Sequence, residues 1–168
     1  MMKPLVTAAI ASTLVYLFDA WVLGQGAIAF LVAAIAVLVA VAKGLAALAG
    51  KRGRAAAVQL GVGLLWVTTV ALTFVTVRFH ASHAQARAET VVSACKAYKA
   101  ANGAYPNALQ DLVPRYLPAV PRAKYTLTFG EFLYHRTPHD ETMLMYTQIP
   151  PFLRTFYDFE KDRWSTLD

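Results

Sequence analysis

The pattern of apolar and polar positions along the chain changes once, near Arg78. Before that point, apolar residues fill three nearly unbroken runs at residues 4–23, 26–42 and 55–77. Each run approaches the ~20 residues that a helix needs to cross about 30 Å of hydrocarbon. We therefore expect a membrane anchor at residues 1–79. A cleaved signal peptide is the alternative for the first run, but that run exceeds the usual ~7–15-residue signal core.

After Ala81 the apolar positions fall on one side of a helix. They recur at spacings of three and four residues and are expected to face a sheet: Ala84, Ala88, Val91, Val92, Cys95 and Tyr98. Apart from Gly61 and Gly63, no Gly or Pro interrupts residues 55–102. This favours one helix that continues from the third span. Two separate helices joined by a linker at residues 78–87 are the competing interpretation.

The long helix is expected to end at Gly103, because Gly tolerates the left-handed conformation that commonly follows a helix. Tyr105 and Pro106 then favour an extended exit. We expect Gly103, Tyr105 and Pro106 to form a helix-exit turn. Asn107, with Gln110 three residues later, predicts the capped start of a short helix.

The remaining residues predict short strands. Tyr125, Leu127 and Phe129 alternate with threonines, which is typical of a one-sided strand. Further strands are expected at residues 131–136, 142–148, 153–159 and 163–167, with a turn at residues 137–140. Such an antiparallel meander can place one apolar face on the amphipathic helix. The predicted fold class is an α+β membrane protein.

Residues 97–106, AYKAANGAYP, carry a resemblance to a known family. They resemble the segment where the long helix ends in type II secretion major pseudopilins and related type IV pilin-like proteins. The likeness continues through Leu112-Val113-Pro114 and Tyr116-Leu117-Pro118 and covers Val91 to Pro121. It implies a pilin-like domain at residues 80–168, in which the long helix packs on the sheet.

Two features of that family have no counterpart in this sequence. No Gly precedes a Phe/Met-Thr-Leu-x-Glu motif, so we expect no processing by a prepilin peptidase. The acidic residues near the C-terminus sit in ordinary predicted turns, so no calcium ligands are transferred. No cofactor is expected.

The distribution of charge predicts a topology. The net charge is +6, and residues 1–77 hold five basic residues against Asp19 alone. Lys43, Lys51, Arg52 and Arg54 crowd the second connection between spans, and such positive connections stay in the cytoplasm. We expect a multi-pass protein of the bacterial inner membrane with a cytoplasmic N-terminus and a periplasmic C-terminal domain. A nucleic-acid partner is not expected, because the basic residues do not cluster with aromatics on one domain.

Several residues of the spans and of the long helix are candidate packing or functional sites. Gly61, Gly63, Thr68 and Thr69 give the third span a small, hydroxylated side suited to packing against other helices. Asp19 is expected near the outer interface and solvated. Cys95, on the apolar stripe, is expected to be a buried and unreactive thiol.

The histidines suggest no strong chemistry. His80 and His83 can share one side of a helix, but two ligands do not close a zinc site, so we expect wet interfacial imidazoles. His135, His139, Asp140 and Glu141 form a dense polar group that is expected to be an exposed turn.

These patterns favour a non-enzymatic protein. The leading hypothesis is an accessory or assembly protein whose partners are the bilayer and pilin- or pseudopilin-like envelope proteins, with homo-oligomers possible. An independent envelope protein that shares only the fold is the second hypothesis, since fold does not fix function. A membrane enzyme or transporter is the third.

Overall fold

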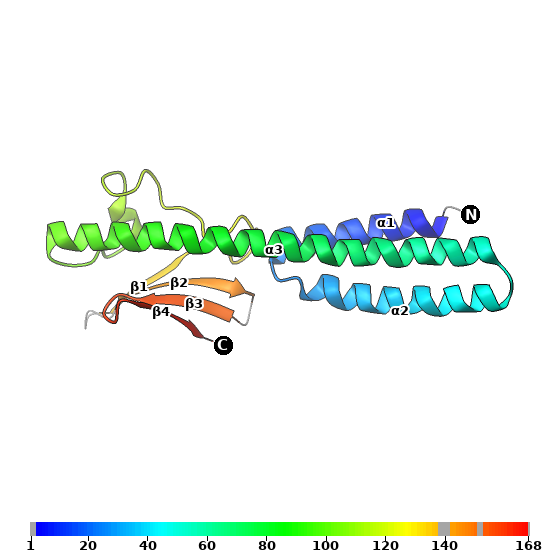
Figure 1. Cartoon of the computed structure of the whole chain (residues 1–168). Coiled ribbons are helices and arrows are strands. Elements are labelled where there is room, and N and C mark those ends of the chain that lie inside the picture. Colours follow the sequence, from blue (N-terminus) through cyan, green and yellow to red (C-terminus); the bar gives the residue numbers. More distant parts are fainter. Residues whose placement is uncertain (1–2, 138–141, 151–152, 168) are drawn as a thin grey trace. The chain divides into compact units, whose positions relative to one another are not determined.

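The structure is a computed structural model that describes residues 3–137, 142–150 and 153–167. Its contacts divide the chain into two compact units, Met1–Arg78 and Phe79–Asp168. Each unit is described by itself below, and Figure 1 shows the elements of both.

The first unit contains helices only. α1 covers Lys3–Tyr16 and continues as a short π-helix, η1, at Leu17–Leu23; α2 covers Ala27–Ala49. Gly24 and Gly26, with φ of 69° and 83°, turn the chain between them. Together with α3, these segments form three helices that are long and apolar enough to cross a membrane. Many of their large apolar side chains are exposed. Helices that are apolar on all sides are typical of membrane spans.

α3 is a single helix of 50 residues, Gly53–Asn102. It has no break at residues 78–87, so the interpretation with two helices and a linker is not what the structure shows. Residues 53–78 belong to the first unit and residues 79–102 to the second. The continuity follows from an interior without Pro, since Pro would remove a helix hydrogen bond.

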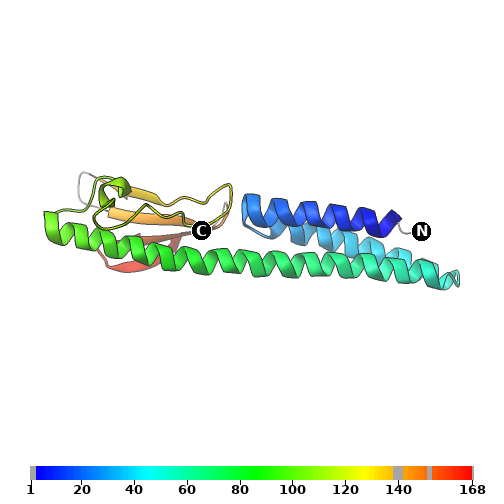
Figure 2. The ribbon, with the colours of Figure 1, turned by 90° about the horizontal axis from the view of Figure 1, so that it is seen from above.

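The second unit packs a sheet against α3 (Figures 1 and 2). The sheet has four strands in the order β1-β2-β3-β4, all antiparallel. Their bounds are Leu133–Arg136, Thr142–Ile149, Leu153–Asp158 and Arg163–Leu167. These agree closely with four of the expected strands. The turn at residues 137–140 lies mostly outside the described residues.

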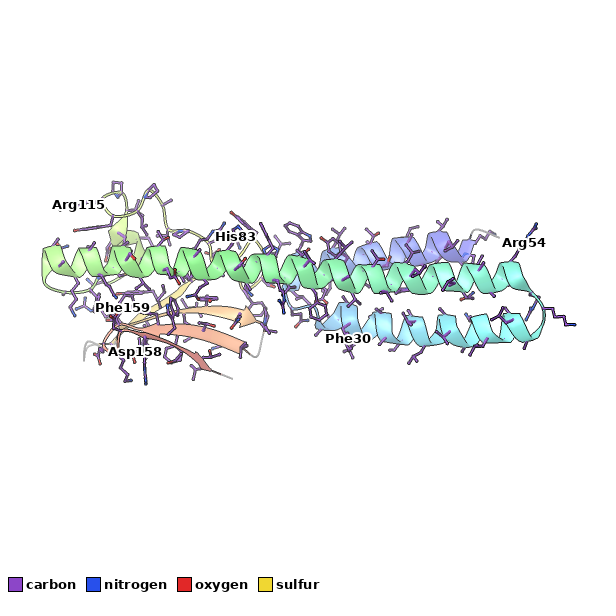
Figure 3. The ribbon with its side chains drawn as sticks, viewed as in Figure 1. Phe30, Arg54, His83, Arg115, Asp158 and Phe159 are labelled. Atoms are coloured by element: carbon purple, nitrogen blue, oxygen red, sulfur yellow. The ribbon has the colours of Figure 1, made fainter. Side chains whose placement is uncertain are left out.

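The core of the second unit lies between α3 and the sheet. Leu144, Tyr146 and Tyr157 are buried on the sheet side, and Phe159 lies between helix and strands (Figure 3). Tyr157 and Phe159 meet with ring centroids 4.9 Å apart. Alternate residues of β2 point toward the helix because side chains of a strand alternate between faces.

The connection from α3 to β1 differs from expectation in two places. Residues 125–129 form no strand: Phe129 has φ of 55°, and this backbone cannot continue an extended ladder. The short helix is a single 3-10 turn, η2, at Leu109–Leu112. Its start is held by Asp111, whose carboxylate accepts from the N–H groups of Asn107 and Ala108 at 2.9 and 3.0 Å, so the predicted Asn107–Gln110 cap is wrong.

Candidate interaction surfaces

The small side of α3 contacts α1 and the start of α2. A Cβ added to Gly61 would lie 3.0 Å from Leu5 Cδ2, so α1 approaches closely there. The Tyr16 hydroxyl and Thr76 Oγ1 are 3.1 Å apart. A Cβ added to Gly26, the residue before α2, would lie 3.8 Å from Thr73 Cγ2, which is an ordinary van der Waals distance.

The hydroxyl groups of Thr69 and Thr73 form hydrogen bonds within their own helix. Thr69 Oγ1 donates to the Leu65 carbonyl at 2.9 Å, and Thr73 Oγ1 donates to the Thr69 carbonyl at 2.8 Å. Thr69 and Thr73 are buried, whereas Thr68 is exposed. Back-bonded hydroxyls present their methyl groups to neighbours, so this side acts as a packing surface.

Asp19 is not solvated. Its side chain is fully buried, and Oδ1 and Oδ2 accept from the N–H groups of Gly26 and Ala29 at 3.2 and 2.6 Å. These are donors at the N-terminus of α2 that have no partner within the helix, and a carboxylate is favoured there. The residue therefore ties η1 to α2. The expectation of a solvated carboxylate is therefore wrong, because the sequence did not reveal the turn that covers it.

α2 and α3 leave an apolar groove between them. Gly63 lies in its lining, and a Cβ added there would meet nothing within 4 Å. The other wall comes from α2, including Val37, Ala40 and Gly44. Gly61 and Gly63 thus differ: one is covered by α1, and the other faces open space.

The expected helix face of the second unit lies in the core. Ala84, Val91, Val92 and Cys95 are buried, and Tyr98 is half-buried with its ring centroid 5.5 Å from that of Tyr116. Burial raises the pKa of the Cys95 thiol to about 12. A thiol with so high a pKa holds almost no thiolate at neutral pH, and the thiolate is the nucleophile.

The helix-exit turn holds the end of α3 against the sheet. Gly103 has φ of 81°, and its N–H donates to the Lys99 carbonyl at 2.8 Å. The Tyr105 ring lies 4.8 Å from that of Phe159. The carbonyl of the buried Pro106 accepts from the Tyr134 hydroxyl at 2.8 Å.

His80 and His83, near the start of the part of α3 that belongs to the second unit, differ in their exposure. His80 is 1% exposed, so the expectation of a solvent-exposed imidazole is wrong for this residue. His83 is half-buried, and its Nδ1 lies 2.9 Å from the Phe79 carbonyl oxygen. Burial, followed by Lys124, His83 and Arg87, lowers the pKa of His80. The neutral imidazole is therefore favoured in this basic surrounding.

Lys124 is the residue that sequence reasoning missed. It is 1% exposed, and its Nζ donates to the Gln148 carbonyl at 2.5 Å. Burial lowers its pKa from 10.5 to about 8. No sequence pattern marks it, since a Lys between Ala123 and Tyr125 reads as the polar position of an alternating segment.

The dense polar group near the β1–β2 turn is only partly described. His135 is exposed on β1, whereas His139, Asp140 and Glu141 lie outside the described residues. Over residues 3–137, 142–150 and 153–167, no group of three or more His, Cys, Asp or Glu side chains could hold a metal ion.

The candidate residues described above thus form packing contacts within the two units. Comparisons with protein-family models, with curated proteins and with solved structures gave no match.

Proposed function

We propose that this chain is a bacterial inner-membrane accessory protein that presents its second unit to the periplasm for protein–protein interaction. Its partner would be a type IV pilus or type II secretion-like machine. The observation that carries the proposal is α3: one helix, Gly53–Asn102, that is apolar and exposed in its first part and packed on a sheet in its second.

The membrane part of the proposal rests on hydropathy and charge. Three helices are long and apolar enough to cross a bilayer. The turn between α2 and α3 carries Lys51 and Arg52, and Arg54 follows at the start of α3, where Figure 3 labels it. Basic connections remain on the cytoplasmic side, which directs the second unit outward.

The interaction part rests on the outer face of α3. Small exposed residues recur there at spacings of three and four: Ala86, Thr90, Ser93, Ala97 and Ala101. Small side chains allow another helix to approach closely. The opposite face is covered by the sheet, so this outer face is the helical surface that remains for a partner.

Topology is tested first, with single cysteines in a Cys95→Ala chain. A membrane-impermeant maleimide applied to intact spheroplasts should label Lys161→Cys, on the β3–β4 turn, but not Lys51→Cys. Both native side chains are exposed, so the two variants differ only in the expected side of the membrane. Labelling of Lys51→Cys alone would show the opposite topology and contradict the proposal.

The partner is tested by photocrosslinking in cells. A photoreactive amino acid at Ala86 or Ala97 should give adducts with pilus or secretion components, whereas one at Arg115 should not. Arg115 is exposed in the connection after η2 and is not part of α3 (Figure 3). Adducts only with unrelated envelope proteins would favour an independent role for the same architecture.

A further inference from the structure

Hydrogen bonds between its own residues hold the loop from Lys124 to Gly130 closed. The Lys124 N–H donates to the Gly130 carbonyl at 3.1 Å. Thr126 is fully buried; its Oγ1 donates to the Thr128 carbonyl at 2.7 Å, and its own carbonyl accepts from Arg122 Nη2 at 3.1 Å. The polar groups therefore point inward and fix the loop.

The apolar side chains of the same loop point outward. Leu127 is 74% exposed, more than any other large apolar side chain in the described residues, and Phe129 is 46% exposed. Phe129 has φ of 55°, which is unusual for a bulky residue. The exposure of Leu127 and Phe129 on a closed loop indicates that the loop contacts an apolar environment.

The loop lies at the end of the second unit where α3 enters that unit. The Arg87 guanidinium stands 4.1 Å above the Tyr125 ring, and the His80 ring lies 6.3 Å from it. The Lys124–Gln148 hydrogen bond joins the loop to the end of β2. We call the exposed apolar residues at this end the apolar rim: Phe79, Tyr125, Leu127, Phe129 and Ile149.

The distance along α3 places this rim near a bilayer surface. The third span is expected to end at Val77, and His80 follows after three residues, or ~4.5 Å at 1.5 Å per residue. The headgroup region on each side of a bilayer is about 5–8 Å thick. The contact between His80 and Tyr125 therefore falls within that region.

The chemistry of the rim fits the same environment. Aromatic side chains are enriched at membrane interfaces. Arg87 lies over the Tyr125 ring of the rim, Arg122 donates to the Thr126 carbonyl, and Glu131 is paired with Arg122 at 2.8 Å. Basic groups beside exposed apolar ones are suited to anionic lipid headgroups.

We propose that the Lys124–Gly130 loop inserts Leu127 and Phe129 into the outer interface of an anionic bilayer. This inference rests on the proposed insertion of residues 55–77. The loop gives the second unit a point of contact with lipid in addition to α3. It also accounts for the inward polar and outward apolar division of the loop.

The test uses the full chain, with Cys95→Ala, in vesicles of phosphatidylcholine and phosphatidylglycerol. An environment-sensitive fluorophore is attached at Leu127→Cys, and brominated lipid serves as the quencher. Val113→Cys is the matched control: Val113 is also exposed and apolar, at 36%, but it lies three residues before Tyr116, whose ring centroid is 5.5 Å from that of Tyr98. Tyr98 is ~27 Å further along α3 than His80. Val75→Cys, within the third span, reports insertion of α3.

Brominated lipid should quench the label at residues 127 and 75 but not at 113, and emission at residue 127 should shift to the blue. Quenching at residue 75 without quenching at 127 overturns the loop inference and leaves the proposed anchor intact. Loss of quenching at both sites removes the anchor itself. A blue shift at residue 127 without quenching shows burial against protein, such as a second copy, and also overturns the inference.

Discussion

Asp19 Oδ2 lies 2.6 Å from the backbone nitrogen of Ala29 and accepts its hydrogen bond, which joins the end of η1 to the first turn of α2. The second oxygen accepts from Gly26 at 3.2 Å. The carboxylate thus takes two donors that would otherwise lack partners in an apolar surrounding, where an unmade hydrogen bond is costly. This makes it a structural residue of the first unit.

Asp19→Ala should lower stability by roughly 1–2 kcal/mol, because it removes a helix cap and leaves two donors unpaired. The measurement is the midpoint of SDS-induced unfolding of the purified chain in mixed micelles. Ser12→Ala is the control: Ser12 is also buried, but its hydroxyl donates to the Ala9 carbonyl of its own helix. Equal midpoints for the two variants would contradict the capping role.

Gly61→Leu and Gly63→Leu should separate the covered side of α3 from its open groove. A side chain at residue 61 collides with Leu5, and overpacking of this kind costs about 1–3 kcal/mol. At residue 63 nothing lies within 4 Å, so the change should be within about 0.5 kcal/mol. SDS unfolding midpoints measure both. A larger loss at residue 63 would mean that the groove is filled by another helix.

Cys95 should be protected from thiol reagents in the folded chain. It is the single cysteine, it is fully buried, and its pKa is raised to about 12. We expect labelling by maleimide to be at least about 100-fold slower than in denaturant, since reaction requires opening of a stable core. Ser93→Cys with Cys95→Ala places a thiol two residues away on the exposed side. Fast labelling of native Cys95 would disprove the helix–sheet packing.

Lys124 should make the stability of the second unit depend on pH. Its pKa is about 8 when folded and 10.5 when unfolded, so between these values the unfolded chain binds the additional proton. Stability therefore rises with pH across this window, and below pH 8 the buried ammonium carries its full cost. Lys124→Met should remove the slope and stabilise the chain at pH 7 by roughly 1–3 kcal/mol.

Trp164 fluorescence during urea unfolding, with Trp21 and Trp66 replaced by Phe, measures this slope. Trp164 packs 5.0 Å from Tyr157 and so reports on the sheet. Lys161→Met is the control, because Lys161 is exposed on the β3–β4 turn. A pH slope that survives in Lys124→Met would assign the effect to another group.

The failures of sequence reasoning share a cause. Residues 125–129 have the alternation of a strand, but a strand needs a partner edge, and here Thr126 and Gly130 close a loop instead. His80 and Lys124 are polar residues whose burial depends on segments distant in sequence. Asp19 is buried by a turn whose course no periodicity reveals.

The sequence by itself determined the three apolar helices, the one-sided face from Ala84 to Tyr98, the end at Gly103 and four strands, because each depends on local periodicity or on the backbone freedom of one residue. Only the tertiary structure decided which glycine of α3 is covered, where the Asp19 carboxylate binds and that Leu127 points outward. Those outcomes depend on contacts between residues far apart in the chain, which a local pattern does not encode.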